Sequence, residues 1–118
     1  MNEAQMHPRQ STEKVWLASY PSSVPPEIPA LSYTSLAHLF ESCCAEYLTR
    51  TAFSSMGREM TYRQLEAETR KIGAWLQAQG LAKGDRVAVM MPNVLQNPVV
   101  TYGILRAGFV VVNVNPLY

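Results

Sequence analysis

The chain has 118 residues, of which 47% are hydrophobic and 16% charged, with a net charge of +1, and this suffices for one domain with a single core. The charges of both signs are interspersed, so the sequence lacks the basic face that binds nucleic acid and no nucleic-acid partner is expected. Because an average soluble domain carries about 25% charged residues, we expect part of this surface to be covered by further protein.

Cysteine usage argues against both a disulfide framework and a zinc site. Cys43 and Cys44 are the only cysteines, and adjacent cysteines rarely bridge each other. His7 and His38 stand at no recognisable metal-ligand spacing from them. We interpret both thiols as reduced, small apolar side chains on a helix, which favours a reducing compartment.

The N-terminal part is first polar and then rich in proline. Residues 1–13 are aperiodic and predict a disordered leader, without the apolar stretch of a secretory signal. Residues 14–33 contain four prolines, from Pro21 to Pro29, and predict an extended arm instead of a helix or a central strand. Apolar side chains such as Trp16 indicate that the arm packs onto the domain or onto a second subunit.

The segment after the arm predicts a helix with one apolar face. Its apolar residues recur at helical spacing, and Thr34 or Ser35 can supply the capping oxygen. The residues on this face are Leu36, Leu39, Phe40, Cys43 and Tyr47.

A short hairpin and a second helix are expected next. Residues 52–56 and 59–62 predict two strands, with the turn at Gly57 and Arg58. Thr61 with Gln64 is a capping box that begins the helix, and Gly80 is its expected end. The buried side of this helix is predicted to consist of Leu65, Thr69, Ile72 and Leu76.

The C-terminal part predicts a strand–helix–strand unit. Residues 86–91 lack clean alternation, which is typical of a strand covered on both faces. Asn97, followed by proline, is an expected cap for a helix over residues 98–107, which Gly108 ends. Residues 109–114 are rich in β-branched side chains and predict a second strand, parallel to the first.

These elements define the fold class as α/β. We expect residues 34–118 to form a partial α/β subdomain, with a mostly parallel sheet and flanking helices. Apolar runs such as Phe109–Val112 are far too short to span a bilayer.

No catalytic constellation can be identified in the sequence. The glycines match neither a dinucleotide-binding loop nor a Walker loop, no serine lies in a G-x-S-x-G elbow, and Glu66 and Glu68 do not share a helix face. We therefore assign no catalytic, cofactor-binding or metal-binding residue.

The stretch MMPN, Met90–Asn93, has two interpretations. A strand that runs straight into Pro-Asn ends sharply at the edge where α/β sheets bind ligands. In the simpler interpretation Pro92 stops the strand and Asn93 stabilises a turn. In the alternative, this stretch lines a ligand site.

Three stretches carry a resemblance to a known family. MTYRQL (60–65), GDRVAVMMPN (84–93) and LRAGFVVVNVNP (105–116) resemble the N-terminal region of the acyl-adenylate-forming enzymes. VWLASYPSSVPPEI, which begins at Val15, and the closing NVNPLY look most like bacterial long-chain fatty-acid–CoA ligases. The similarity extends from there to Tyr118.

The resemblance implies an AMP-forming ligase as the parent protein. In this family ATP and a fatty acid give an acyl-adenylate and pyrophosphate, with Mg²⁺ shielding the phosphates, and coenzyme A then displaces AMP. The family's phosphate loop, aromatic-Thr-Glu motif, ribose-binding acidic residues and C-terminal lysine have no counterpart in this sequence. We therefore expect a fragment that binds no cofactor itself, serves as a scaffold and is inactive alone.

Two other functions stay open at this point: a stand-alone interaction or assembly module without catalysis, and an adenylate former for another carboxylic acid. The expected partners are the rest of the parent chain and a second copy, because the strand over residues 109–114 would leave an edge or an apolar face uncovered. The resemblance implies a cytoplasmic protein and a parent that acts on a fatty acid. Association of the parent with the inner face of the membrane is left open.

Overall fold

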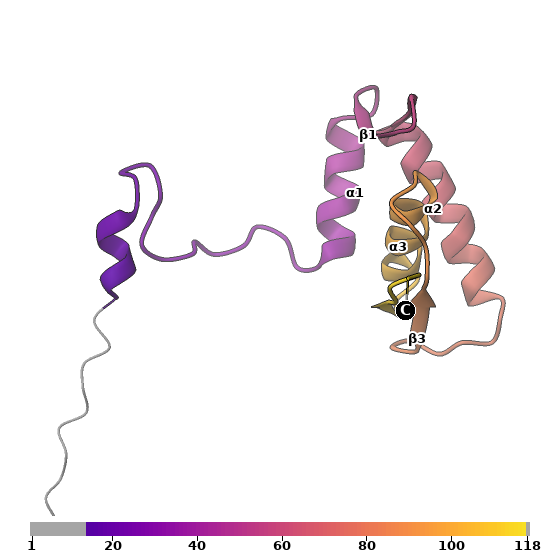
Figure 1. Ribbon diagram of the computed structural model, residues 1–118. Coiled ribbons are helices and arrows are strands. Elements are labelled where there is room, and N and C mark those ends of the chain that lie inside the picture. The colour runs from indigo at the N-terminus through magenta and orange to yellow at the C-terminus, as the bar shows by residue number, and fades with distance from the viewer. Residues whose placement is uncertain (1–13, 118) are drawn as a thin grey trace, which may run out of the picture. The chain divides into compact units, whose positions relative to one another are not determined.

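The computed structural model describes residues 14–117 (Figure 1). The leader predicted over residues 1–13 lies outside the described residues. The chain divides into two units, residues 1–31 and residues 32–118. The sequence-based division into leader, arm and subdomain stays a prediction.

The first unit contains a short helix where an extended arm is predicted. η1 (Val15–Ser19) is a 3₁₀ helix, in which Leu17 N donates to Lys14 O at 3.0 Å and Tyr20 N donates to Leu17 O at 3.1 Å. Proline has no N–H group, but all four prolines of the arm follow this segment. The residues of η1 therefore keep the N–H groups that the hydrogen bonds of a 3₁₀ helix need. The prediction of an extended conformation is therefore wrong for η1.

Two helices of the second unit begin at caps that the sequence predicts. α1 (Leu36–Glu46) follows Ser35, whose Oγ accepts a hydrogen bond from the His38 N–H at 3.0 Å. α2 (Tyr62–Gln77) follows Thr61, and the predicted capping box is complete. Both signals are local, because each capping bond joins groups within one turn of the chain.

The predicted hairpin is present, with its turn shifted by one position. β1 (Thr51–Ser55) and β2 (Arg58–Thr61) pair antiparallel. The turn consists of Met56 and Gly57, whose φ angles are 50° and 73°. Two successive positive φ angles match the twist of a two-residue hairpin turn, so the turn predicted at Gly57 and Arg58 is corrected.

The predicted strand–helix–strand unit is confirmed. β3 (Arg86–Val89) and β4 (Val110–Asn113) form a parallel pair, and α3 (Gln96–Arg106) connects them. The fold class is therefore α/β. The described residues hold two sheets of two strands each, since the hairpin does not join the parallel pair.

α3 begins two residues earlier than predicted. Its N-cap is Leu95, which makes no capping bond through its side chain. Asn97, the predicted cap, lies inside the first turn, where its Nδ2 donates to the carbonyls of Met91 and Pro92 at 3.4 Å each. The prediction is wrong because this amide stabilises the preceding loop and not the end of the helix.

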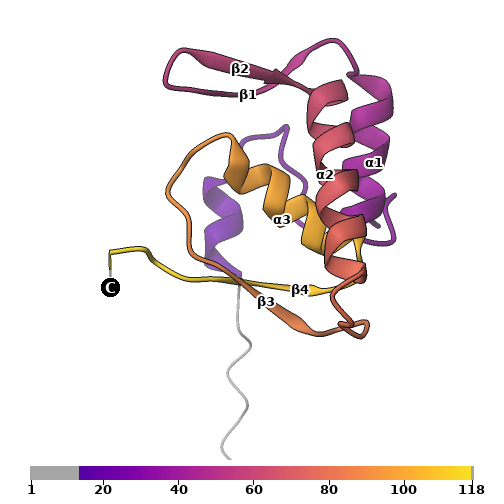
Figure 2. The same cartoon turned by 90° about the vertical axis from the view of Figure 1, so that its right-hand side faces the viewer.

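α3 lies against one face of the β3–β4 sheet and leaves the other face open (Figure 2). Val89 is buried beneath α3, and Val111 packs beside it. On the opposite face Met90, Val110 and Val112 are 62%, 44% and 37% exposed. The expectation that the first of these strands is covered on both faces is therefore wrong for the described residues.

The core consists of two clusters, joined by Ile72, which packs against both. The first lies between the three helices and contains Phe40, Cys44, Leu65 and Val99. The second connects α2 and α3 to the parallel strands and contains Leu76, Val89, Ile104 and Phe109. On α1 it is Cys44 that is fully buried, while the predicted Cys43 is half-buried.

Two glycines allow α2 and α3 to approach each other closely. A Cβ atom on Gly103 would lie 2.7 Å from Ile72 Cγ2 and 3.1 Å from Thr69 O. A Cβ atom on Gly73 would lie 3.3 Å from Gly103 O, which a small shift can relieve. The helix pair is therefore much less tolerant of a methyl group at Gly103 than at Gly73.

Arg106, the last residue of α3, connects the three helices. Its side chain is 12% exposed. One guanidinium nitrogen donates to Thr69 Oγ1 at 2.8 Å and to Glu66 O at 3.1 Å. The others reach Glu66 Oε1 at 3.2 Å and Glu41 Oε1 at 3.3 Å, and the group lies 5.5 Å from the centre of the Phe40 ring. The hydroxyl of Thr69, which is fully buried, is thereby satisfied.

The carboxylate of Glu66 is shared by two arginines, since Arg70 bonds the same oxygen. The hydrogen bond from Arg70 and, less strongly, that from Arg106 hold the pKa of Glu66 below its ordinary value, against the opposing effect of burial. A carboxyl whose folded-state pKa is lowered adds stability above its unfolded pKa. This contribution is lost as the pH falls through the folded-state pKa of Glu66.

Replacing Arg106 tests the link between the helices. Arg106→Met is expected to lower the free energy of unfolding by about 1.5–3 kcal/mol, because it removes several hydrogen bonds from a nearly buried cation. Arg70→Met is the matched control, since it removes the exposed partner of the same carboxylate and should cost less. Chemical denaturation measures both, and equal losses for the two variants would contradict a special role for Arg106.

Adding a methyl group tests the close helix contact. Gly103→Ala is expected to destabilise the chain by about 1–3 kcal/mol, because the new Cβ overlaps Ile72 and cannot shift away from the α2 backbone. Gly73→Ala should be nearly neutral, since the helix propensity gained offsets a mild contact. Thermal unfolding followed by circular dichroism compares the two, and a Gly103→Ala variant as stable as the wild type would contradict the packing.

Candidate functional site

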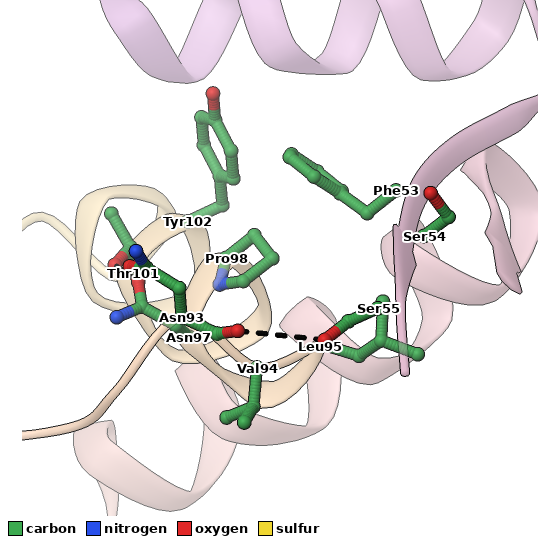
Figure 3. Close-up of a pocket in the computed structure, with 10 residues that line it drawn as sticks. All are labelled: Phe53, Ser54, Ser55, Asn93, Val94, Leu95, Asn97, Pro98, Thr101 and Tyr102. Carbon is green, nitrogen blue, oxygen red and sulfur yellow. Dashed lines mark hydrogen bonds between the residues drawn. The ribbon is translucent and has the colours of Figure 1, made fainter. Parts of the chain in front are cut away.

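A pocket of about 380 Å³ lies between β1 and the start of α3, beside the end of the loop that follows β3 (Figure 3). We call it the outer pocket. Of the stretch Met90–Asn93, only Asn93 lines it. Its full lining is Phe53, Ser54, Ser55, Asn93, Val94, Leu95, Asn97, Pro98, Thr101 and Tyr102.

The walls of the outer pocket are mainly apolar. Phe53, from β1, and Tyr102, from α3, stand on opposite sides, with Pro98 between them (Figure 3). The Tyr102 ring is held by stacking on Phe40, with ring centroids 4.4 Å apart and the planes inclined by 21°. Phe53 lies on a short strand and remains 37% exposed. One wall of the pocket is therefore fixed by the core, and the other is not.

The polar groups of the outer pocket are uncharged, and two pairs of them are bonded to each other. Ser55 Oγ donates to Asn93 O, and Thr101 Oγ1 donates to Asn97 Oδ1, both at 3.4 Å. These lengths indicate weak bonds that a ligand group can replace. Because the lining contains no charged side chain and no nucleophile paired with a base, this geometry supports binding and not acid–base or covalent catalysis.

A smaller apolar pocket adjoins the outer one. This inner pocket measures about 160 Å³ and lies under α1. Phe53 and Tyr102 line both pockets and so form the partition between them. The other lining residues of the inner pocket are Leu36, Leu39, Phe40, Cys43, Tyr62 and Leu65.

The remaining candidate groups show no reactive arrangement. Burial raises the pKa of the Cys44 thiol to about 11, which outweighs the opposing effect of Arg106, so this thiol is protonated at neutral pH. Within residues 14–117 no cluster of three or more His, Cys, Asp or Glu side chains is placed to hold a metal ion. Within the same range, no helix has the length and apolar character needed to cross a membrane.

The sequence analysis did not identify Phe53, Tyr102 or Arg106 as important. One signal was available for Arg106, which is the single charged residue in the apolar stretch 98–107. No comparable signal distinguishes Phe53 and Tyr102, because they line the same pocket from β1 and α3, which are far apart in the sequence.

Comparison with known proteins places the chain in a family. It matches the family model of the AMP-binding enzymes over residues 40–118. It is 54% identical over 107 residues to a long-chain-fatty-acid–CoA ligase of Yersinia pestis and 56% identical over 107 residues to that of Salmonella typhimurium. Both alignments cover 90% of this chain, which spans 19% of the length of each of these relatives.

The fold is also similar to that of a solved structure, the anthranilate CoA ligase AuaEII in complex with anthranoyl-AMP. The TM-score is 0.69 at 25% sequence identity, over 75% of this chain and 17% of that one. The stretches 60–65, 84–93 and 105–116, on which the resemblance rests, all fall inside the matched region. The chain therefore belongs to the family of the AMP-binding enzymes.

Proposed function

We propose that the chain is the N-terminal part of a long-chain fatty-acid–CoA ligase, which converts a fatty acid to its CoA thioester with cleavage of ATP to AMP and pyrophosphate. The observation that carries this proposal is the identity of 54% and 56% to such ligases over 90% of the chain. Identity to the anthranilate ligase is 25%. A long-chain fatty acid is therefore better supported as the parent's substrate than another carboxylic acid.

Within the parent, this part serves as a scaffold that is inactive alone. Two features support the role. Arg106 and the two core clusters hold the three helices together. The open face of the β3–β4 sheet exposes Met90, Val110 and Val112, although parallel sheets are normally covered on both faces. The rest of the parent chain is the partner that would cover this face.

The parent's cofactors would be bound outside these residues. A nucleoside triphosphate with Mg²⁺ needs cationic side chains and oxygen ligands around its phosphates. The outer pocket offers uncharged hydroxyl and amide groups among apolar walls, which do not fit that chemistry. We therefore expect ATP, Mg²⁺ and coenzyme A to bind at other parts of the parent. We expect the parent to be cytoplasmic, and its apolar substrate favours association with the inner face of the membrane.

An activity assay tests the scaffold role. The purified chain is expected to form no palmitoyl-CoA from palmitate, ATP, Mg²⁺ and coenzyme A, because the outer pocket has no charged side chain to bind the phosphates. Chromatography of the thioester and of AMP measures the reaction. The control is the polypeptide extended to the length of the relatives, which should turn over. Thioester formation by the chain alone would contradict the scaffold role, and an inactive extended polypeptide would contradict the ligase assignment.

Self-association tests the open sheet face. The chain is expected to form a homo-oligomer through Val110 and Val112, because apolar side chains on an open sheet face gain by mutual burial. Val112→Lys should weaken the association roughly tenfold or more, since it would bury an unpaired charge. Trp75→Lys, at a 60% exposed position of α2, is the matched control.

Sedimentation equilibrium measures the association constant of each variant. A wild-type chain that stays monomeric at high concentration would contradict the prediction. So would equal weakening by Val112→Lys and Trp75→Lys, because the association would then not depend on the open sheet face.

A further inference from the structure

The outer and inner pockets adjoin each other and differ in chemistry. The outer pocket carries hydroxyl and amide groups, whereas the inner one is lined almost entirely by apolar side chains. Phe53 and Tyr102 belong to both linings, so a molecule that passes between their rings touches both pockets. The two pockets together thus offer polar groups on the outer side and apolar walls on the inner side.

The inner pocket has the size of one small ring. An engineered apolar cavity of about 150 Å³ in another protein stays dry and binds benzene. The inner pocket measures about 160 Å³, and Leu36, Leu39 and Leu65 contribute aliphatic walls beside the Phe40 ring. A benzene-sized apolar group therefore fits it, and its burial there is favourable.

The partition between the pockets offers a hydrogen-bonding group. The Tyr102 hydroxyl makes no hydrogen bond to another residue within 14–117, whereas the nearby Thr101 and Asn97 are bonded to each other. This hydroxyl is reachable by solvent, because no buried side-chain oxygen or nitrogen of the described residues is without a partner. A ligand oxygen placed at the partition would replace water at this hydroxyl.

We propose that the two pockets together form a binding site for a neutral amphiphilic small molecule, with a benzene-sized apolar end in the inner pocket and one uncharged hydrogen-bonding head group at the Tyr102 hydroxyl. A charged head group is disfavoured, because no side chain of either lining carries a compensating charge. This site does not depend on the ligase assignment, since it uses none of the chemistry of adenylate formation.

Benzyl alcohol is the probe that tests the site on the whole chain. Titration followed by ¹H–¹⁵N correlation spectra should give saturable shifts of the amides of Phe53, Tyr102 and Cys43. Benzoate, which has the same size and a negative charge, should bind at least about tenfold more weakly. Shifts that do not saturate, shifts spread over the whole chain, or equal binding of benzoate would each overturn the proposal.

Two variants separate the pockets. Cys43→Leu fills the inner pocket and should weaken benzyl alcohol binding about tenfold. Tyr102→Phe keeps the ring and removes the hydroxyl, so it should weaken benzyl alcohol roughly fivefold while leaving toluene unchanged. Trp75→Phe, on the exposed side of α2, is the control and should bind like the wild type.

If Cys43→Leu does not fold, the comparison of benzyl alcohol with toluene in Tyr102→Phe still tests the proposal. Equal loss of both ligands in Tyr102→Phe, or no loss of either, would overturn the assignment of the head group to the Tyr102 hydroxyl.

Discussion

The hydrogen bonds of Arg106 are the interaction on which the second unit depends. α1 and α3 have 11 residues each and α2 has 16, lengths at which isolated helices are marginal in water. Their stability must come from contacts between them. Arg106 leaves the end of α3 and reaches Glu66 and Thr69 on α2 and Glu41 on α1, so one nearly buried cation joins all three. Because Gly103 has no Cβ atom, α3 approaches Ile72 and Thr69 of α2 closely. This close approach allows the Arg106 side chain to reach α2.

The same constraint extends to the pockets through a row of rings. The guanidinium of Arg106 lies against the Phe40 ring, and Phe40 in turn stacks on Tyr102. Tyr102 is therefore held from the side of the core, whereas Phe53 projects from a hairpin of only two strands. A wall fixed by packing faces a wall that can adjust, which suits a pocket that admits a small molecule. The position of Tyr102 is thus a consequence of how the helices are joined, whereas the loop after β3 contributes Asn93, Val94 and Leu95 to the outer pocket.

The sequence predicts what depends on neighbours in the chain and misses what depends on distant contacts. The caps at Ser35 and Thr61 are confirmed, because each bond closes within one helical turn. The start of α3 is wrong, since Asn97 bonds loop carbonyls instead of capping. The α/β class follows from the alternation of strands and helices. That Phe53 and Tyr102 line the same pockets could not be predicted, because it depends on the position of β1 relative to α3.

Composition and structure both concern the open face of the β3–β4 sheet. The chain carries 16% charged residues, below the roughly 25% of an average soluble domain. In the second unit, the open face of the parallel strands exposes Val110 and Val112, which lie beside Arg86 and Ala88 in register. A parallel pair is rarely stable with one face in water, because its hydrophobic residues are suited to burial on both sides. The low charge and the exposed Val110 and Val112 are therefore consistent with the proposed covering of this face by further protein.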